Sequence, residues 1–285
     1  AAGVQLSEGR LGLVILEKAV GADAKWAMIA SGNAEVVGVS GLKLSGGLDL
    51  RMNRYGDPVD ETISTLDGDV RVYFTTGDSL TQIAGNLRLE TPVASLSGDF
   101  TAEATGNSPN REILFSATNV SAFVGDTKGT ASTADDIGVR FSGGSLVGYI
   151  APDSTYAFDA SGTAAIVGVS DLTLTGTLSA QKNTTGANVS KSITVAGVTR
   201  TLSVAANASR VGGSVTLITP VASLSADFAV ETTGTSPNQE ILFAANNVST
   251  FVGDTKGTES TTDDIGVRFS GGSLVGYIAP DSTYA

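Results

Sequence analysis

The chain repeats itself, and this constrains its fold more than any other feature. Residues 91–157 return at 219–285 with an offset of 128, and 56 of the 67 aligned residues are identical. The segment GVRFSGGSL at 138–146 returns at 266–274, and a diverged form, GVQLSEGRL, occupies 3–11. Repeats of this kind bury an open face of one unit against the next, which favours a rod, fibre or array over an enzyme domain.

The recurrence predicts three segments: repeat module 1 at 1–137, repeat module 2 at 138–265, and the opening of a third repeat at 266–285. The chain begins Ala1-Ala2 and shows no signal peptide, so we interpret it as a processed chain or a fragment. At 41% hydrophobic residues it can build a core. Its 35 glycines, together with abundant Ser, Thr, Ala and Val, are typical of a β-rich protein with many turns.

Composition also argues against several functions. The chain has no cysteine, so disulfides and thiolate metal sites are excluded. It has no histidine, the commonest general base and transition-metal ligand, and we therefore expect no enzyme activity. A net charge of −12 would repel nucleic acid, which we do not expect as a partner. No apolar run approaches the roughly 20 residues of a membrane span.

Strict alternation of apolar and small or polar residues dominates the local pattern. Leucines at 42, 44, 48 and 50 predict a strand with one buried face, and related strands recur at 96–100, 174–178 and 224–228. Turn signals at 107–110, 54–58 and 183–186 each predict a hairpin connection. We therefore predict an all-β fold of tandem antiparallel repeats, a long meander stacked into an elongated sandwich-like or solenoid-like rod. A parallel β-solenoid is the alternative.

One stretch, 13–30, is rich in helix formers. The repeat aligns Trp26 with Tyr156 and Tyr284, and the residues after Tyr156 alternate, so we predict strand, loop and strand here, with a short helical turn at 19–24 as the alternative. An aromatic residue at this repeat position predicts a core or inter-repeat contact more readily than a stacking ligand site.

Two acidic loops are the candidate metal sites. Residues 125–136 read GDTKGTASTADD, and residues 253–264 repeat this pattern. Carboxylates with hydroxyls and backbone carbonyls suit a hard cation, so calcium is the candidate cofactor, and a solvated acidic loop without a cofactor is the alternative. The candidate ligands are Asp126, Asp135 and Asp136 in the first loop and Asp254, Asp263 and Asp264 in the second.

The recurring motifs NVSxFVGD, GVRFSGGSLVGYI and YAFDASGTAAIVGVSDLTLTGTLSA resemble tandem β-repeat modules of giant secreted bacterial surface and adhesin-type proteins. The resemblance implies an extracellular or cell-surface location and a spacer, adhesion or filament role. This chain lacks the glycine-rich calcium-binding nonapeptide of many such proteins.

We therefore expect a structural segment of an extracellular filament or giant surface protein. It would propagate by β packing with itself, through neighbouring repeats or further copies, because its two unfinished ends present strand edges. The alternative is an adhesin module that binds glycan or a cell surface through its loops, with or without calcium. A carboxylate hydrolase using the acidic residues near 57–69 is the enzyme-class rival.

Overall fold

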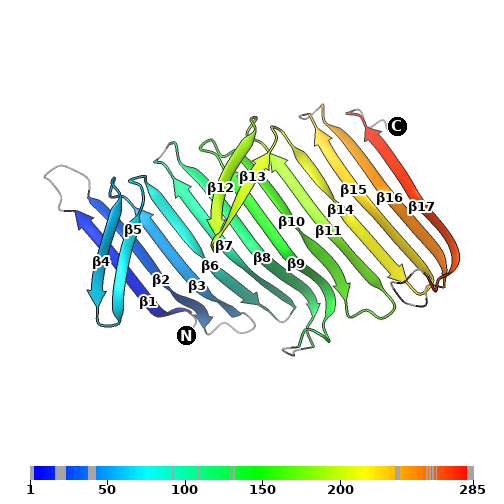
Figure 1. The fold of residues 1–285 in the computed structure, drawn as a ribbon, viewed down its shortest axis with the longest axis horizontal. Helices are drawn as coiled ribbons and strands as arrows, with labels where there is room; N and C mark the ends of the chain where they lie inside the picture. The colour runs from blue at the N-terminus through cyan, green and yellow to red at the C-terminus, as the bar shows by residue number, and fades with distance from the viewer. Residues whose placement is uncertain are drawn as a thin grey trace.

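The computed structural model describes residues 3–16, 24–37, 43–91, 93–107, 109–128, 130, 132–234, 238–254, 256, 258, 260 and 262–280. Within these residues the protein is all-β, and it is an open, elongated assembly of strands (Figure 1). No helix in this part of the chain is long and apolar enough to cross a membrane.

One antiparallel sheet of 13 strands forms the body of the protein, in the order β1-β2-β3-β6-β7-β8-β9-β10-β11-β14-β15-β16-β17. Its strands are β1 (Gly3–Leu16), β2 (Lys25–Val37), β3 (Lys43–Asn53), β6 (Leu80–Glu90), β7 (Ala94–Thr105), β8 (Glu112–Asp126), β9 (Ile137–Ile150), β10 (Tyr156–Val167), β11 (Thr173–Asn183), β14 (Ser209–Thr219), β15 (Ala222–Thr233), β16 (Glu240–Asp254) and β17 (Ile265–Ile278). All strand pairs are antiparallel, which confirms the predicted fold class and shows that the parallel solenoid alternative is wrong.

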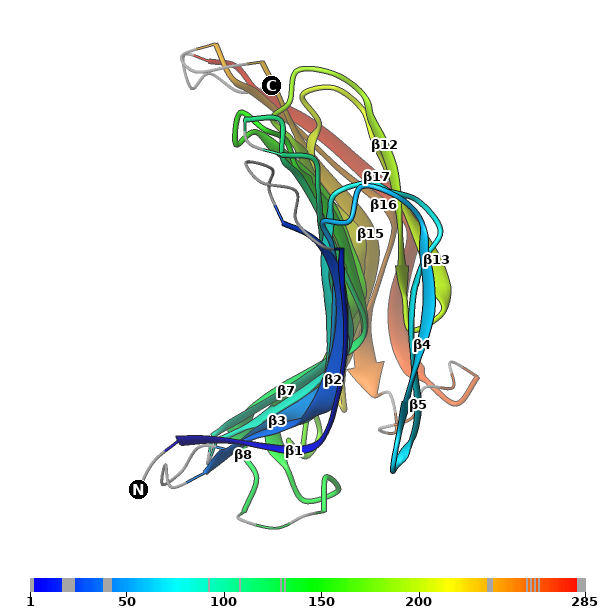
Figure 2. The same ribbon diagram turned by 90° about the vertical axis from the view of Figure 1, so that its left-hand side faces the viewer.

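Two hairpins leave this sheet and form a partial second layer. They are β4 (Val59–Thr65) with β5 (Gly68–Phe74), and β12 (Val189–Val195) with β13 (Val198–Val204). Both lie on the same side of the sheet (Figure 2). The turn signals at 54–58 and 183–186 were therefore wrongly interpreted as hairpin connections within one meander. They lead into the second layer, while β3 pairs with β6 and β11 pairs with β14.

A buried asparagine at the base of each hairpin directs the chain out of the sheet. The Asn183 side chain donates to the carbonyls of Ala187, Val204 and Ala205 at 2.8, 3.2 and 2.9 Å, and accepts from the Thr185 N–H at 2.9 Å. Asn53 takes the equivalent place in the first period, where it donates to the Thr76 carbonyl and accepts from the Tyr55 N–H. These amides bond to backbone groups at the hairpin bases, so both hairpin bases are fixed.

Aligned β-bulges bend the sheet. Register shifts occur between Ser7 and Arg10 in β1, Ser97 and Asp99 in β7, and Ala117 and Val120 in β8. Asn119 sits in β8 with a φ of 55°, a conformation that asparagine tolerates well. Since each bulge bends its strand and bulges in neighbouring strands coincide, the whole sheet arches (Figure 2).

Glycines in the sheet make room for aromatic rings on the next strand. Gly148 pairs with Phe115, and a Cβ added at Gly148 would come within 2.2 Å of that ring. Gly276 and Phe243 repeat this pair 128 residues later, with a corresponding distance of 2.0 Å. The high glycine content therefore reflects close packing within strands as well as turns.

The predicted modules share one sheet. The boundaries at 137/138 and 265/266 fall at the start of β9 and β17, and the hydrogen-bonded ladder continues across both. β17 lies six strand positions after β9 in the sheet, so one period contributes six strands to the sheet and two strands to a hairpin. The predicted strands at the two ends of 13–30 correspond to the end of β1 and the start of β2. Residues 17–23 and Tyr284 lie outside the described residues.

Candidate functional site

The first acidic loop does not gather its carboxylates. Asp126 accepts hydrogen bonds from the Lys128 ammonium at 2.7 Å and from the Lys128 backbone N–H at 2.8 Å, and the ammonium bond lowers the pKa of Asp126. Asp135 accepts from the Thr130 hydroxyl at 3.1 Å. Asp136 is buried, 4% exposed, and accepts from the Arg140 guanidinium at 2.8 Å. The three predicted ligands are thus held by three different donors.

The second loop repeats the arrangement. Lys256 bonds Asp254 through its ammonium and its backbone N–H, Thr258 bonds Asp263, and Arg268 bonds Asp264. In the part of the chain that the structure describes, no group of three or more acidic side chains is placed to hold a metal ion. Residues 129, 131, 255, 257, 259 and 261 of these loops lie outside that part. Calcium binding stays a prediction.

The arginine that binds the buried aspartate has a packing role that sequence reasoning missed. The Arg140 guanidinium lies 5.8 Å from the centroid of the Phe123 ring, and Phe123 is 5% exposed. Arg268 and Phe251 repeat this at 5.2 Å. Asp136 therefore positions a cation over an aromatic face, an arrangement that is stronger when partly removed from water. The sequence DDIGVRF occurs at both 135–141 and 263–269, and this repetition was the sequence signal that could have indicated the arrangement.

Two of the acidic residues near 57–69, Asp57 and Asp60, form ion pairs on the surface. Arg71 donates two hydrogen bonds to Asp60, at 2.7 and 2.8 Å, and they lower the pKa of Asp60. Lys25 lies 3.7 Å from Asp57. Leu66 and Asp67 form the turn between β4 and β5. Nothing in these pairs brings two free carboxylates together for hydrolytic chemistry.

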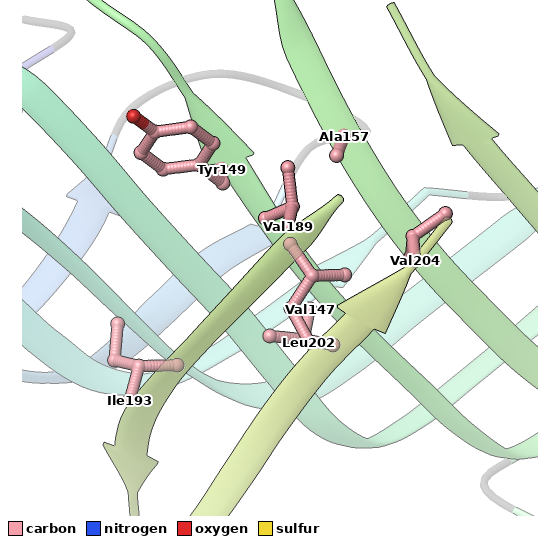
Figure 3. Close-up of a cluster of buried hydrophobic side chains, with 7 residues drawn as sticks. All are labelled: Val147, Tyr149, Ala157, Val189, Ile193, Leu202 and Val204. Carbon is pink, nitrogen blue, oxygen red and sulfur yellow. The ribbon is translucent and has the colours of Figure 1, made fainter. Parts of the chain in front are cut away.

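The main hydrophobic core lies between β12–β13 and the sheet. Hairpin β12–β13 packs across β7 to β11, and Leu202 and Ala157 are fully buried in this core. Figure 3 shows Val189, Ile193, Leu202 and Val204 of the hairpin facing the sheet residues, which include Val147. Hairpin residues alternate strictly here, with Ile193 and Val195 buried and Thr194 exposed, because one face meets the sheet and the other meets water.

A polar network closes this interface at one side. The Lys191 ammonium bonds Glu112 at 2.8 Å and lies 4.9 Å from the centroid of the Tyr149 ring, whose hydroxyl donates to Glu112 at 2.8 Å. Lys191 lowers the pKa of Glu112. Burial, reinforced by the hydrogen bond to Glu112, raises the pKa of Tyr149 to about 12. Three residues from β8, β9 and β12 thus fix the hairpin on the sheet.

The same sheet face recurs on β15–β17, and no hairpin among the described residues packs over it. Val275 is 74% exposed, whereas Val147 at the same repeat position is 8% exposed. Leu242 is 42% exposed, whereas its counterpart Leu114 is partly buried against the hairpin core. The charge pattern also recurs, with Glu240 and Tyr277 at the positions of Glu112 and Tyr149.

The opposite face of the sheet carries an apolar groove of about 530 Å³. Phe100, Ala117 and Leu146 lie opposite one another on β7, β8 and β9, and Phe141 lines the same groove. Leu146 alternates with Val147, which faces the hairpin, so this groove lies on the inner side of the arch. It can accommodate apolar groups.

Comparison of the chain with protein-family models, with curated proteins and with solved structures finds no match.

Proposed function

We propose that the protein is a structural segment of an extracellular filament or giant surface protein, in which the sheet continues from repeat to repeat. One observation carries the proposal: two periods share a single open sheet, and the ladder crosses the period boundary without interruption. Such a sheet grows by one period through the addition of six strands.

The edges of the sheet support continuation. β1 and β17 are 14 residues long each, and they form the two edges. Val267 and Phe269 on β17 are 78% and 56% exposed. Long, apolar edge strands are open to pairing, and proteins that stay monomeric blunt such edges with charges, prolines or a covering element.

Strand direction defines which neighbour fits. β1 and β17 run the same way (Figure 1), so two copies related by translation would meet through parallel pairing. Every pair inside the sheet is antiparallel. β17 is the repeat counterpart of β9, and β9 pairs with β10, so antiparallel continuation beside β17 needs the counterpart of β10 from a further repeat. The proposal therefore favours growth by whole repeats, in which β10-type strands follow β9-type strands.

Electron microscopy of the purified chain, with calcium and with chelator, tests the proposal. A filament of separate chains repeats once per chain. At a strand spacing of about 4.8 Å, the 13 strands of the sheet give an axial repeat of roughly 62 Å, and we expect filaments with that repeat. Val267→Lys should weaken assembly by charging the β17 edge. Thr199→Lys, at an exposed position of β13, is the matched control.

Equal assembly by the Val267→Lys variant and by the unchanged chain would show that the edge has no role. Isolated short rods from the full chain would contradict assembly of separate chains. Dissolution of filaments by chelator would support the calcium prediction for the Asp126 and Asp254 loops.

A further inference from the structure

We propose that the exposed face of β15–β17 is a docking site for a β-hairpin of the β12–β13 type, contributed by an adjacent repeat module and carrying a basic residue at the position of Lys191. The inference rests on the proposed function, because it names the partner that covers one face of the continuing sheet. It concerns a different surface from the β17 edge.

The occupied copy of the site defines the fit. On β7–β9 this face is covered by β12–β13, and Val147 and Tyr149 there are 8% and 7% exposed. The sheet segment 240–254 repeats 112–126 with three differences, and 265–278 repeats 137–150 without any. An identical backbone register joins β16 to β17 and β8 to β9. The uncovered face therefore repeats the β7–β9 part of the surface that β12–β13 covers.

Exposure points to the same occupant. Val275 on the edge strand β17 is 74% exposed, and Leu242 on the adjacent strand β16 is 42% exposed. Both face the side on which the hairpins lie, because Val147 and Leu114 do so at the equivalent positions. A contiguous apolar patch on a repeat surface marks a contact site, and here the chain itself shows what covers such a patch.

The charge at the position of Lys191 determines which of the two hairpins in this chain suits the exposed face. Glu240 stands where Glu112 binds Lys191, and among the described residues Glu240 has no ion-pair partner. Hairpin β4–β5 carries Glu61 at the position of Lys191. Docking of β4–β5 from a second copy would therefore place two carboxylates together, whereas a β12–β13-type hairpin restores the pair. Like-charge contacts of this kind select against the wrong partner.

Thiol labelling provides the test, because the chain has no cysteine and Val275→Cys introduces a single thiol. The probe is a peptide of residues 189–204 closed by a D-Pro-Gly turn, which favours the hairpin. We expect this peptide to protect the introduced thiol saturably. The same peptide with Glu for Lys191 should bind about tenfold more weakly, and Glu240→Lys in the protein should reverse the preference. In the control variant Leu66→Cys, the thiol lies at the β4–β5 turn and should stay unprotected.

A second measurement removes dependence on peptide folding. In a Val275→Cys chain extended after Ala285 by residues 158–213, the appended hairpin should protect the thiol, and glutamate at the position of Lys191 in that hairpin should restore labelling. Labelling that stays fast in both experiments would overturn the proposal. So would equal protection by both peptides, which would mean that charge selects nothing.

Protection of the same thiol that appears only as the concentration of the unextended chain rises would assign the face to β4–β5 of a second copy, against the proposal. Protection of the thiol can be measured whether or not the chain forms filaments. Failure of assembly with normal peptide protection would remove the proposed function alone, and normal assembly without protection would remove this inference alone.

Discussion

Truncation of Leu202 tests how hairpin β12–β13 is held. Leu202 is fully buried between the hairpin and the sheet. Replacing a buried leucine by alanine costs about 2–5 kcal/mol. Because the layer is only one hairpin wide, the site can partly collapse, and we expect the lower part of that range, about 2–3 kcal/mol. If the hairpin opens locally, its opening equilibrium should rise by about 30- to 150-fold.

The assay compares labelling of a cysteine introduced in place of Val147, which the hairpin covers, with and without Leu202→Ala. We expect labelling to accelerate by the factor given above under conditions in which the hairpin closes faster than the thiol reacts. A cysteine in place of Ala27, which is fully buried under the other hairpin, is the matched control and should keep its rate. Acceleration below about threefold at position 147 would refute the packing argument, and equal acceleration at position 27 would show that the protein opens globally.

Three further predictions concern other parts of the fold. Asn183→Ala removes the amide that bonds three carbonyls at the hairpin base and should lower the free energy of unfolding by about 2–3 kcal/mol in urea denaturation; a loss below half of that would contradict its role. Gly148→Val drives a side chain into the Phe115 ring and should cost about 1–3 kcal/mol, whereas Gly9→Ala, whose nearest added contact is 3.9 Å, should be nearly neutral; similar losses would refute the ring-over-glycine argument. The pKa of Glu112 is lowered by its bond to lysine, so this pairing should stabilise hairpin β12–β13 above the ordinary value of 4.5 and be lost as pH falls through the lowered pKa. Hydrogen exchange of that hairpin, corrected for intrinsic rates, should show the loss, and Glu112→Gln should abolish its pH dependence.

Much of the fold could be predicted from the sequence. Alternation in segments such as 42–50 and 174–178 correctly predicted strands, but the predicted buried face was wrong at Leu48 and Leu178, which are 37% and 43% exposed. The turn signal at 107–110 correctly joined β7 to β8. The signals at 54–58 and 183–186 have the same composition as hairpin turns, yet they lead out of the sheet. Local residue preferences cannot distinguish these outcomes, because the choice depends on whether β3 finds a better partner in β4 or in β6.

The acidic loops show a different limit of sequence reasoning. Asp126, Asp135 and Asp136 are close in sequence and have suitable chemistry for calcium. The structure gives each of them a separate donor, and Asp136 binds an arginine that stacks over Phe123. Spacing along a loop does not fix the direction of side chains, so the division of carboxylates among donors became visible only in three dimensions.

The all-β class, the period and the absence of histidine and cysteine chemistry follow from the sequence alone, since they depend on composition and on recurrence along the chain. Three-dimensional packing was needed to establish the antiparallel pairing, the second layer of two hairpins, and the meeting of Glu112, Tyr149 and Lys191 at its border. Lys191 lies 79 residues from Glu112, and a contact over that separation is set by packing of the whole sheet, to which local preferences contribute little. The same packing covers Val147 and leaves its identical repeat partner Val275 exposed.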